Sequence, residues 1–314
     1  MTFGSLNTIG DERQLRFVRF LAHPREKVWA ALTDPDLRAG WFFAGALPTV
    51  VGGAVDLIDS DEGVSGTVLR VDSGRLLEFT WNSGDGPASV VRFELSDTVA
   101  GTRLILTHTI SQGSPQDLLA GWHRIVLDDL PEFLDSGAVI EKPGRWETLR
   151  EQHYVPMVAA ALDVRVRPEQ RSVTLVREVS GGVEAAYRAF TDPEVLAQWW
   201  WPHLPDTSYA VDPVVGGEWR IRSVATGIGV RGTFTTVTPP ERLAFTFSWM
   251  SDGQGETLDV GTALDEVEVT LTALPSGAGT LVRVVHSSGG PLGLTEGVGQ
   301  GWQDTLDRLA DCAF

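Results

Sequence analysis

The chain contains one stretch of sequence twice. The segment FVRFLAHPREKVWAALTDPDLRAGW at residues 17–41 recurs as LVREVSGGVEAAYRAFTDPEVLAQW at residues 175–199, and nine of the 25 positions are identical. A repeat with so long a period indicates two copies of one domain of roughly 150 residues. We therefore expect two tandem domains, residues 11–162 and 163–314, each large enough to bury its own core.

Both copies show the same order of residue patterns. A strand (residues 13–21 and 172–179) precedes an amphipathic helix that ends at Thr-Asp-Pro, where proline begins a second, short helix. Alternating apolar residues between Gly-rich turns then predict about five antiparallel strands, followed by a long closing helix. This order predicts an α+β fold in which a curved antiparallel sheet wraps on the closing helix, with a cavity between them.

Two segments break the symmetry of the copies. The first copy carries an extra helix after its closing helix, at residues 145–162, and residues 163–170 read as a linker. The second copy has a longer Gly- and Asp-rich loop at residues 251–261. These differences leave open an interaction protein in which one copy has become a scaffold.

The composition restricts the partners. The net charge is −17, so the chain lacks the basic surface that releases counterions from nucleic acids, and no nucleic-acid partner is expected. A single cysteine, Cys312, leaves neither a disulfide framework nor a thiolate metal cluster, and no metal or cofactor motif is present. No signal peptide and no apolar run of membrane-spanning length is recognisable, so we expect a cytoplasmic protein without membrane insertion.

Two histidines are the candidate catalytic residues. His108 and His286 each end a row of apolar residues that alternate along the last predicted strand, so both point toward the predicted cavity. One interpretation is a cavity group that binds a ligand or moves a proton. The other is a structural histidine at the junction of strand and helix. A histidine stands at this position in both copies. This favours the structural interpretation, because residues that the fold requires are repeated more faithfully than catalytic residues.

Aromatic residues supply the other candidates. Eleven tryptophans exceed what a core of this size usually needs, and most are expected to pack while some line a pocket. Trp122 and Trp302 hold equivalent positions on the closing helices, and we expect Trp81 and Trp249 at matching strand ends. The candidate ligand-binding residues are Trp41, Phe43, Trp81, His108, Trp122, Trp199, Trp200, Trp249, His286 and Trp302.

The shared motifs are T-D-P, V-G-G, G-T, a last strand ending in histidine, and G-W at the closing helix. Their order resembles the SRPBCC superfamily, also called START-like or Bet v 1-like. Within it, the chain is most similar to the branch named after the activator of Hsp90 ATPase, over nearly its whole length and twice. The resemblance implies two helix-grip domains, each with an apolar cavity. Hsp90 itself is not an expected partner, because the second half is a second copy rather than an Hsp90-binding domain.

Three functions remain open. The leading hypothesis is a protein that binds a small hydrophobic or aromatic molecule in a helix-grip cavity, in a stress response or in sequestration of, or self-resistance to, a metabolite. The alternative is an enzyme without a metal, similar to cyclases and aromatases, that uses His108 or His286 as acid and base. The third is an interaction or cochaperone-like protein. We expect a binding protein rather than an enzyme.

Overall fold

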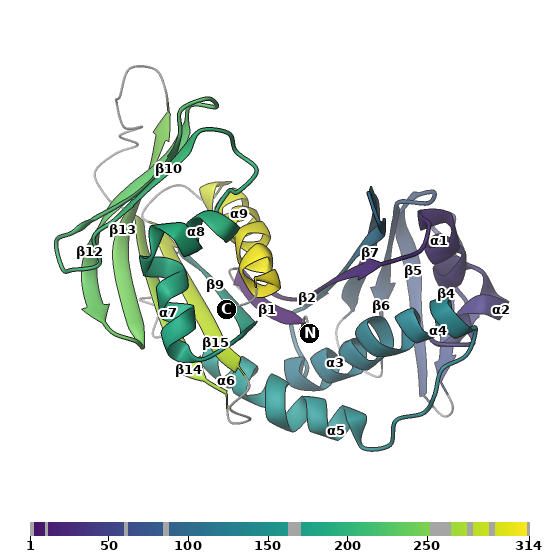
Figure 1. The fold of residues 1–314 in the computed structure, drawn as a ribbon. Helices are drawn as coiled ribbons and strands as arrows, with labels where there is room; N and C mark the ends of the chain where they lie inside the picture. Colours follow the sequence, from purple (N-terminus) through teal and green to yellow (C-terminus); the bar gives the residue numbers. More distant parts are fainter. Residues whose placement is uncertain are drawn as a thin grey trace. The chain divides into compact units, whose positions relative to one another are not determined.

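The computed structural model describes residues 3–9, 12–59, 62–83, 88–162, 171–251, 265–274, 279–288 and 293–312. Contacts divide the chain into two compact units. The N-terminal unit is Asp11–Val158 with Thr2–Leu6, and the C-terminal unit is Ala159–Phe314 with Asn7–Gly10 and Met1. The predicted linker at residues 163–170 and all but the first residue of the predicted loop at 251–261 lie outside the described residues. The architecture is α+β, with extensive antiparallel sheet and several helices (Figure 1).

The N-terminal unit is built on antiparallel strands. Their order across the sheet is β2 (Glu12–Leu21), β8 (Gly101–Ile110), β7 (Ser89–Thr98), β6 (Leu76–Trp81), β5 (Glu62–Asp72), β4 (Ala54–Asp59) and β3 (Ala44–Ala46). A short strand β1 (Ser5–Ile9) precedes β2. Helices α1 (Arg25–Thr33) and α2 (Pro35–Arg38) follow β2, and Asp34 caps α2 by accepting hydrogen bonds from the next two free backbone amides.

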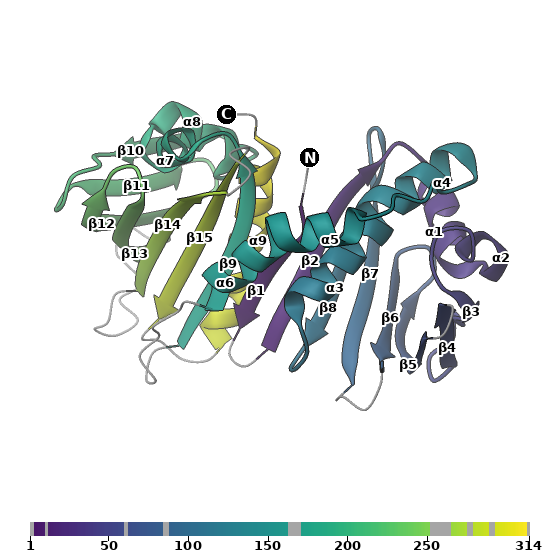
Figure 2. The ribbon, with the colours of Figure 1, turned by 90° about the horizontal axis from the view of Figure 1, so that it is seen from below.

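The closing helix of this unit is not a regular α-helix. It consists of α3 (Pro115–Trp122), a π-helical stretch η1 (His123–Asp129) and α4 (Leu130–Ser136), and it ends at Gly137 with φ +78°. Figure 2 shows α3 and α4 running across one face of the unit's sheet. The extension that follows comprises α5 (Arg145–Leu149), a second π-helical stretch η2 (Arg150–Tyr154) and α6 (Val155–Leu162). The sequence predicted ordinary helices at both places and did not predict the π-helical stretches.

The C-terminal unit has the same order of elements. Its strands follow one another as β10 (Thr207–Val211), β11 (Glu218–Ser223), β12 (Ile228–Thr238), β13 (Arg242–Ser251), β14 (Asp265–Ala273), β15 (Gly279–Ser288) and β9 (Arg171–Ser180). Helices α7 (Val183–Thr191) and α8 (Pro193–Trp199) follow β9, and Asp192 caps α8. The closing helix is α9 (Gly293–Asp311), which is α-helical throughout.

The repeated G-T motif lies where two strands approach closely. A β carbon on Gly66 would lie 1.9 Å from the carbonyl oxygen of Thr80, and one on Gly232 would lie 1.6 Å from that of Thr246. The amide of the threonine after each glycine donates to the hydroxyl of the same Thr80 or Thr246, at 2.9 Å in both units. Only glycine therefore fits this position. The contact also makes Thr80 and Thr246 structurally equivalent, which sets the register for comparing the two units.

Candidate functional site

His108 lies at the centre of the first candidate site, on β8 facing the closing helix. The ring is fully buried, and its Nδ1 accepts a hydrogen bond from the indole Nε1 of Trp122 at 2.9 Å. The neutral ring therefore carries its hydrogen on Nε2, which donates to the Ser89 hydroxyl at 2.8 Å. That hydroxyl in turn donates to the carbonyl of Trp81 at 2.9 Å. Burial lowers the pKa of the His108 imidazole from 6.5 to about 4.

His286 has the same partners in the C-terminal unit, with one change. Its Nδ1 accepts from the indole Nε1 of Trp302 on α9 at 2.8 Å, while its Nε2 lies 3.0 Å from Oδ2 of Asp265. The Nε2 hydrogen therefore points at a carboxylate rather than at a hydroxyl. The chain of contacts from Trp302 through His286 thus reaches an ionisable side chain.

Strand register shows that Ser89 and Asp265 hold the same position. Ser89 pairs with Trp81, the residue after Thr80, and Asp265 pairs with Phe247, the residue after Thr246. In the N-terminal unit the hydrogen-bond chain returns to the backbone and is closed. In the C-terminal unit it continues to the carboxylate of Asp265, a side chain that is 20% exposed.

Neither histidine presents a free ring nitrogen. In each unit one ring nitrogen accepts from a tryptophan of the closing helix and the other donates to the residue at the start of β7 or β14. This arrangement fits the structural interpretation of both histidines. A proton-transfer role for the C-terminal unit would fall to Asp265, with His286 positioning it.

Aromatic rings surround His108 in the N-terminal unit. Trp41 is anchored by its Nε1, which donates to the carbonyl of Ala31 at 3.0 Å. Ring centroids 4.8–5.6 Å apart link Trp41 to Phe42, Phe42 to Phe43 and Trp122, and Phe43 to Trp81. The indole N–H of Trp122 donates to His108, so the indoles of Trp41 and Trp122 both have acceptors. The candidate residues of this unit therefore come together in one packed cluster.

The C-terminal cluster contains more tryptophan and one unmet donor. Trp199 matches Trp41, because its Nε1 donates to the carbonyl of Ala189 at 2.9 Å. Trp200 is 3% exposed, and its Nε1 has no hydrogen-bond acceptor in the described part of the chain. Its ring lies against the rings of Trp199, Trp219 and Trp302, with centroids 4.9–5.3 Å away. A buried N–H without an acceptor costs about 1–3 kcal/mol, so this donor marks a place where an acceptor belongs.

Trp249 does not occupy the place that we expected. The equivalence of Thr80 and Thr246 makes Phe247 the counterpart of Trp81, and Phe247 contacts His286 with ring centroids 4.8 Å apart. Trp249 lies two residues further along β13, is 41% exposed, and stacks on Trp201 at 5.9 Å. The expectation failed because it matched the two tryptophans by residue type, whereas the strand register is set by the glycine contact.

Ser89 and Asp265 were not identified from the sequence as candidate site residues. One common feature could have pointed to them. Ser89 and Asp265 each lie two residues before the valine that pairs with the histidine in the neighbouring strand. Among the described residues no cluster of three or more histidine, cysteine or acidic side chains is arranged for a metal ion. Within the same residues, no helix has the length and apolarity to cross a membrane.

The architecture is thus α+β, and in both units a tryptophan of the closing helix donates to a buried histidine of the preceding strand. The family described as activator of Hsp90 ATPase homolog 1-like protein matches residues 22–135 and 182–313. The chain belongs to this family and carries its domain twice. Among curated proteins, none matches the chain.

Several solved structures are similar to parts or all of the chain. Protein MLL2253 from Mesorhizobium loti is 28% identical over 39% of this chain and 97% of its own, with a TM-score of 0.36. CalU16 from Micromonospora echinospora is 26% identical over 47% of this chain and 88% of its own, with a TM-score of 0.38. DynU16, a protein in the dynemicin biosynthetic locus, is 18% identical over 96% of this chain and 99% of its own, with a TM-score of 0.38.

Proposed function

We propose that residues 11–162 and 163–314 form two helix-grip domains, and that the protein binds a small hydrophobic or aromatic molecule at the aromatic cluster of the second. The observation that carries this proposal is the buried indole N–H of Trp200, which has no acceptor in the described part of the chain. A ligand that contributes an oxygen acceptor would satisfy this donor while its apolar body packs on the neighbouring rings.

The two copies support assigning the ligand to the second one. Phe42 stands where the second copy has Trp200, so the first cluster has no unmet indole donor at this position. The hydrogen-bond chain of the first copy closes on the Trp81 carbonyl, whereas that of the second ends on the carboxylate of Asp265. The second site therefore combines the indole donor of Trp200, the carboxylate of Asp265 and a wall of rings. This set suits an aromatic molecule with a carbonyl or phenol oxygen.

The contact between Asp265 and His286 also supports the second candidate function, a cyclase-like reaction without a metal. A carboxylate held by an imidazole is a common acid–base arrangement, and here the carboxylate is the group nearer to solvent. In this version Asp265 transfers the proton and His286 holds it in place. Replacing Asp265 by Asn would then abolish turnover of a ligand that still binds.

Binding is tested by thermal melting and tryptophan fluorescence of the full chain against hydroxylated flavones, aromatic polyketides and fatty acids. We expect at least one oxygenated aromatic compound to raise the melting temperature of the protein. The Trp200→Phe variant should lose this shift, whereas Trp249→Phe, which changes an exposed ring, should keep it. If no compound shifts the wild-type protein, or if Trp200→Phe binds as tightly as the wild type, the proposal is wrong.

A further inference from the structure

A separate pocket lies in the N-terminal unit, beside the π-helical stretch of its closing helix. Its volume is about 350 Å³, at the small end of the range for ligand sites. Arg124 and Asp129 of η1 form one side, and residues 139–147, which lead into α5, form the rest. None of these residues belongs to the aromatic cluster around His108. The pocket is therefore independent of the proposed ligand site.

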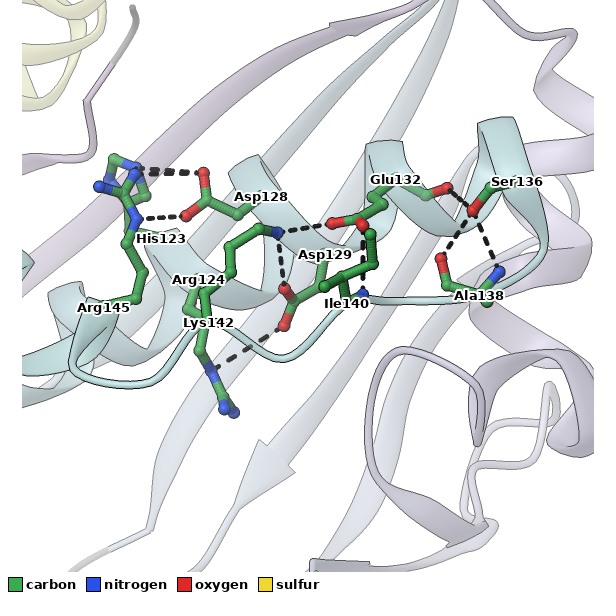
Figure 3. Close-up of polar contacts among 10 residues, drawn as sticks. All are labelled: His123, Arg124, Asp128, Asp129, Glu132, Ser136, Ala138, Ile140, Lys142 and Arg145. Carbon is green, nitrogen blue, oxygen red and sulfur yellow. Dashed lines mark hydrogen bonds and ion pairs between the residues drawn. The ribbon is translucent and has the colours of Figure 1, made fainter.

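Two of the three cations that line the pocket already have carboxylate partners. Lys142 contacts Glu132 with Nζ 2.5 Å from Oε2. Arg145 holds Asp128 through two contacts, at 2.7 Å and 3.3 Å. Figure 3 shows these two pairs together with the longer contacts of Lys142 and Arg124 to Asp129. Neither cation is left to attract an anion into the pocket.

Asp129 makes two long ion pairs, with Arg124 and Lys142, and no short one among the described residues. The residue is 8% exposed, and its nearest cationic nitrogens, Nε of Arg124 and Nζ of Lys142, are both 3.9 Å away. That distance is beyond a hydrogen bond, and within the described part of the chain this carboxylate accepts none. Burial raises the pKa of Asp129 above its usual value, although Arg124 and Lys142 act in the opposite direction. A donor supplied from outside would offset this desolvation.

The charge around the pocket is negative, like that of the Asp129 carboxylate. Its lining carries three cations, Arg124, Lys142 and Arg145, and three carboxylates, Asp129, Glu141 and Glu147. The carboxylates of Asp128 and Glu132, which bind two of those cations, bring the count to five acids against three bases. The local field therefore favours a cation.

The remaining wall is apolar. Ile140, Pro143 and Trp146 line the pocket beside these charged groups. We propose that this pocket binds a small organic cation, a primary ammonium on a short apolar or aromatic body, with the carboxylate of Asp129 as its hydrogen-bond acceptor. The three apolar side chains would cover the body of such a ligand. The site is distinct from the aromatic cluster and does not depend on the function proposed for it.

Calorimetry with three probes of one shape tests the proposal on the full chain. Benzylamine, benzyl alcohol and benzoate differ in charge and share a ring. We expect benzylamine to bind and the other two to give no heat of binding. Binding of benzoate in preference to benzylamine would overturn the proposal, as would the failure of benzylamine to bind.

Variants then locate the site. Asp129→Asn keeps the shape of the side chain and should weaken benzylamine binding about tenfold or more, because a charge-assisted hydrogen bond is lost. The matched control is Asp135→Asn on α4, an exposed acid that removes the same charge outside the pocket. Trp200→Phe should leave benzylamine binding unchanged. Equal binding by wild type and Asp129→Asn would refute the site.

The Arg124→Met variant tests the role of charge by a gain of binding, which an unfolded protein could not show. This change removes a cation that competes for Asp129 and keeps an apolar side chain of similar length. We expect tighter binding of benzylamine, by a fewfold. Weaker binding in this variant, with a wild-type melting temperature, would show that the pocket does not recognise positive charge.

Discussion

The indole of Trp302 donates its hydrogen to Nδ1 of His286 across 2.8 Å, from the closing helix α9 to strand β15. Trp122 makes the same contact with His108 at 2.9 Å. In each unit one buried hydrogen bond thus fixes which ring nitrogen of the histidine accepts and which donates. The contact ties the helix to the sheet at a defined point along its length.

The first prediction concerns the tautomers. Because Nδ1 accepts in both rings, His108 and His286 should carry their ring hydrogen on Nε2. Long-range ¹H–¹⁵N spectra distinguish the two nitrogens directly. Replacing Trp302 by Phe should leave the His108 signals unchanged and release His286 into a mixture of tautomers. Protonated Nδ1 in either ring of the wild-type protein would contradict the structure.

The second prediction concerns the dependence of stability on pH. The pKa of His108 falls from 6.5 to about 4 on burial, so the unfolded chain binds more protons than the folded one between these values. This contribution to stability is complete above pH 6.5 and is lost as the pH falls toward 4, by on the order of 3 kcal/mol. His123 acts in the same direction, because burial lowers its pKa to about 3.

Urea unfolding at pH 7.5 and pH 5 measures this effect. The His108→Gln variant should lose part of the difference between the two pH values, and the remainder belongs to His123 and to other groups. His203→Gln, a change at an exposed histidine, is the control and should behave as wild type. An unchanged pH dependence in His108→Gln would show that this ring is not the source.

The third prediction compares two neighbouring tryptophans. Trp199→Phe breaks the hydrogen bond to the Ala189 carbonyl and leaves that oxygen unpaired, whereas Trp200→Phe removes a donor that has no acceptor in the described part of the chain. Both rings are buried and lose similar area. Trp199→Phe should therefore cost about 1 kcal/mol or more beyond Trp200→Phe in the free energy of unfolding without ligand. Equal losses would mean that Trp200 has an acceptor in solution.

The fourth prediction concerns the G-T motif. Gly66→Ala would place a β carbon against the Thr80 carbonyl, so the two strands must separate, and we expect a loss of more than about 2 kcal/mol. Gly63→Ala on the same strand is the matched control. Its added carbon would lie 3.7 Å from the nearest atom, the Leu57 carbonyl oxygen, which is ordinary contact. Circular dichroism during thermal melting separates the two outcomes, and similar melting temperatures would contradict the close approach.

Local chemistry decided which features could be predicted from the sequence. Thr-Asp-Pro marks the start of a helix by itself, because the aspartate caps it and proline fits its first turn, and α2 and α8 begin there. The position of Asp265 beside His286 depends instead on how two strands pair, which no local pattern encodes. The π-helical stretch η1 could not be predicted either, because its residues keep the apolar spacing of an ordinary α-helix.

The Trp–His contact also limits how such a chain can change over time. Loss of the indole leaves a buried imidazole nitrogen without its donor, and loss of the imidazole leaves a buried indole without its acceptor, so each single step passes through a less stable protein. Replacing both together removes donor and acceptor at once. We therefore expect Trp302 and His286, and likewise Trp122 and His108, to be kept or lost as pairs among relatives of this chain.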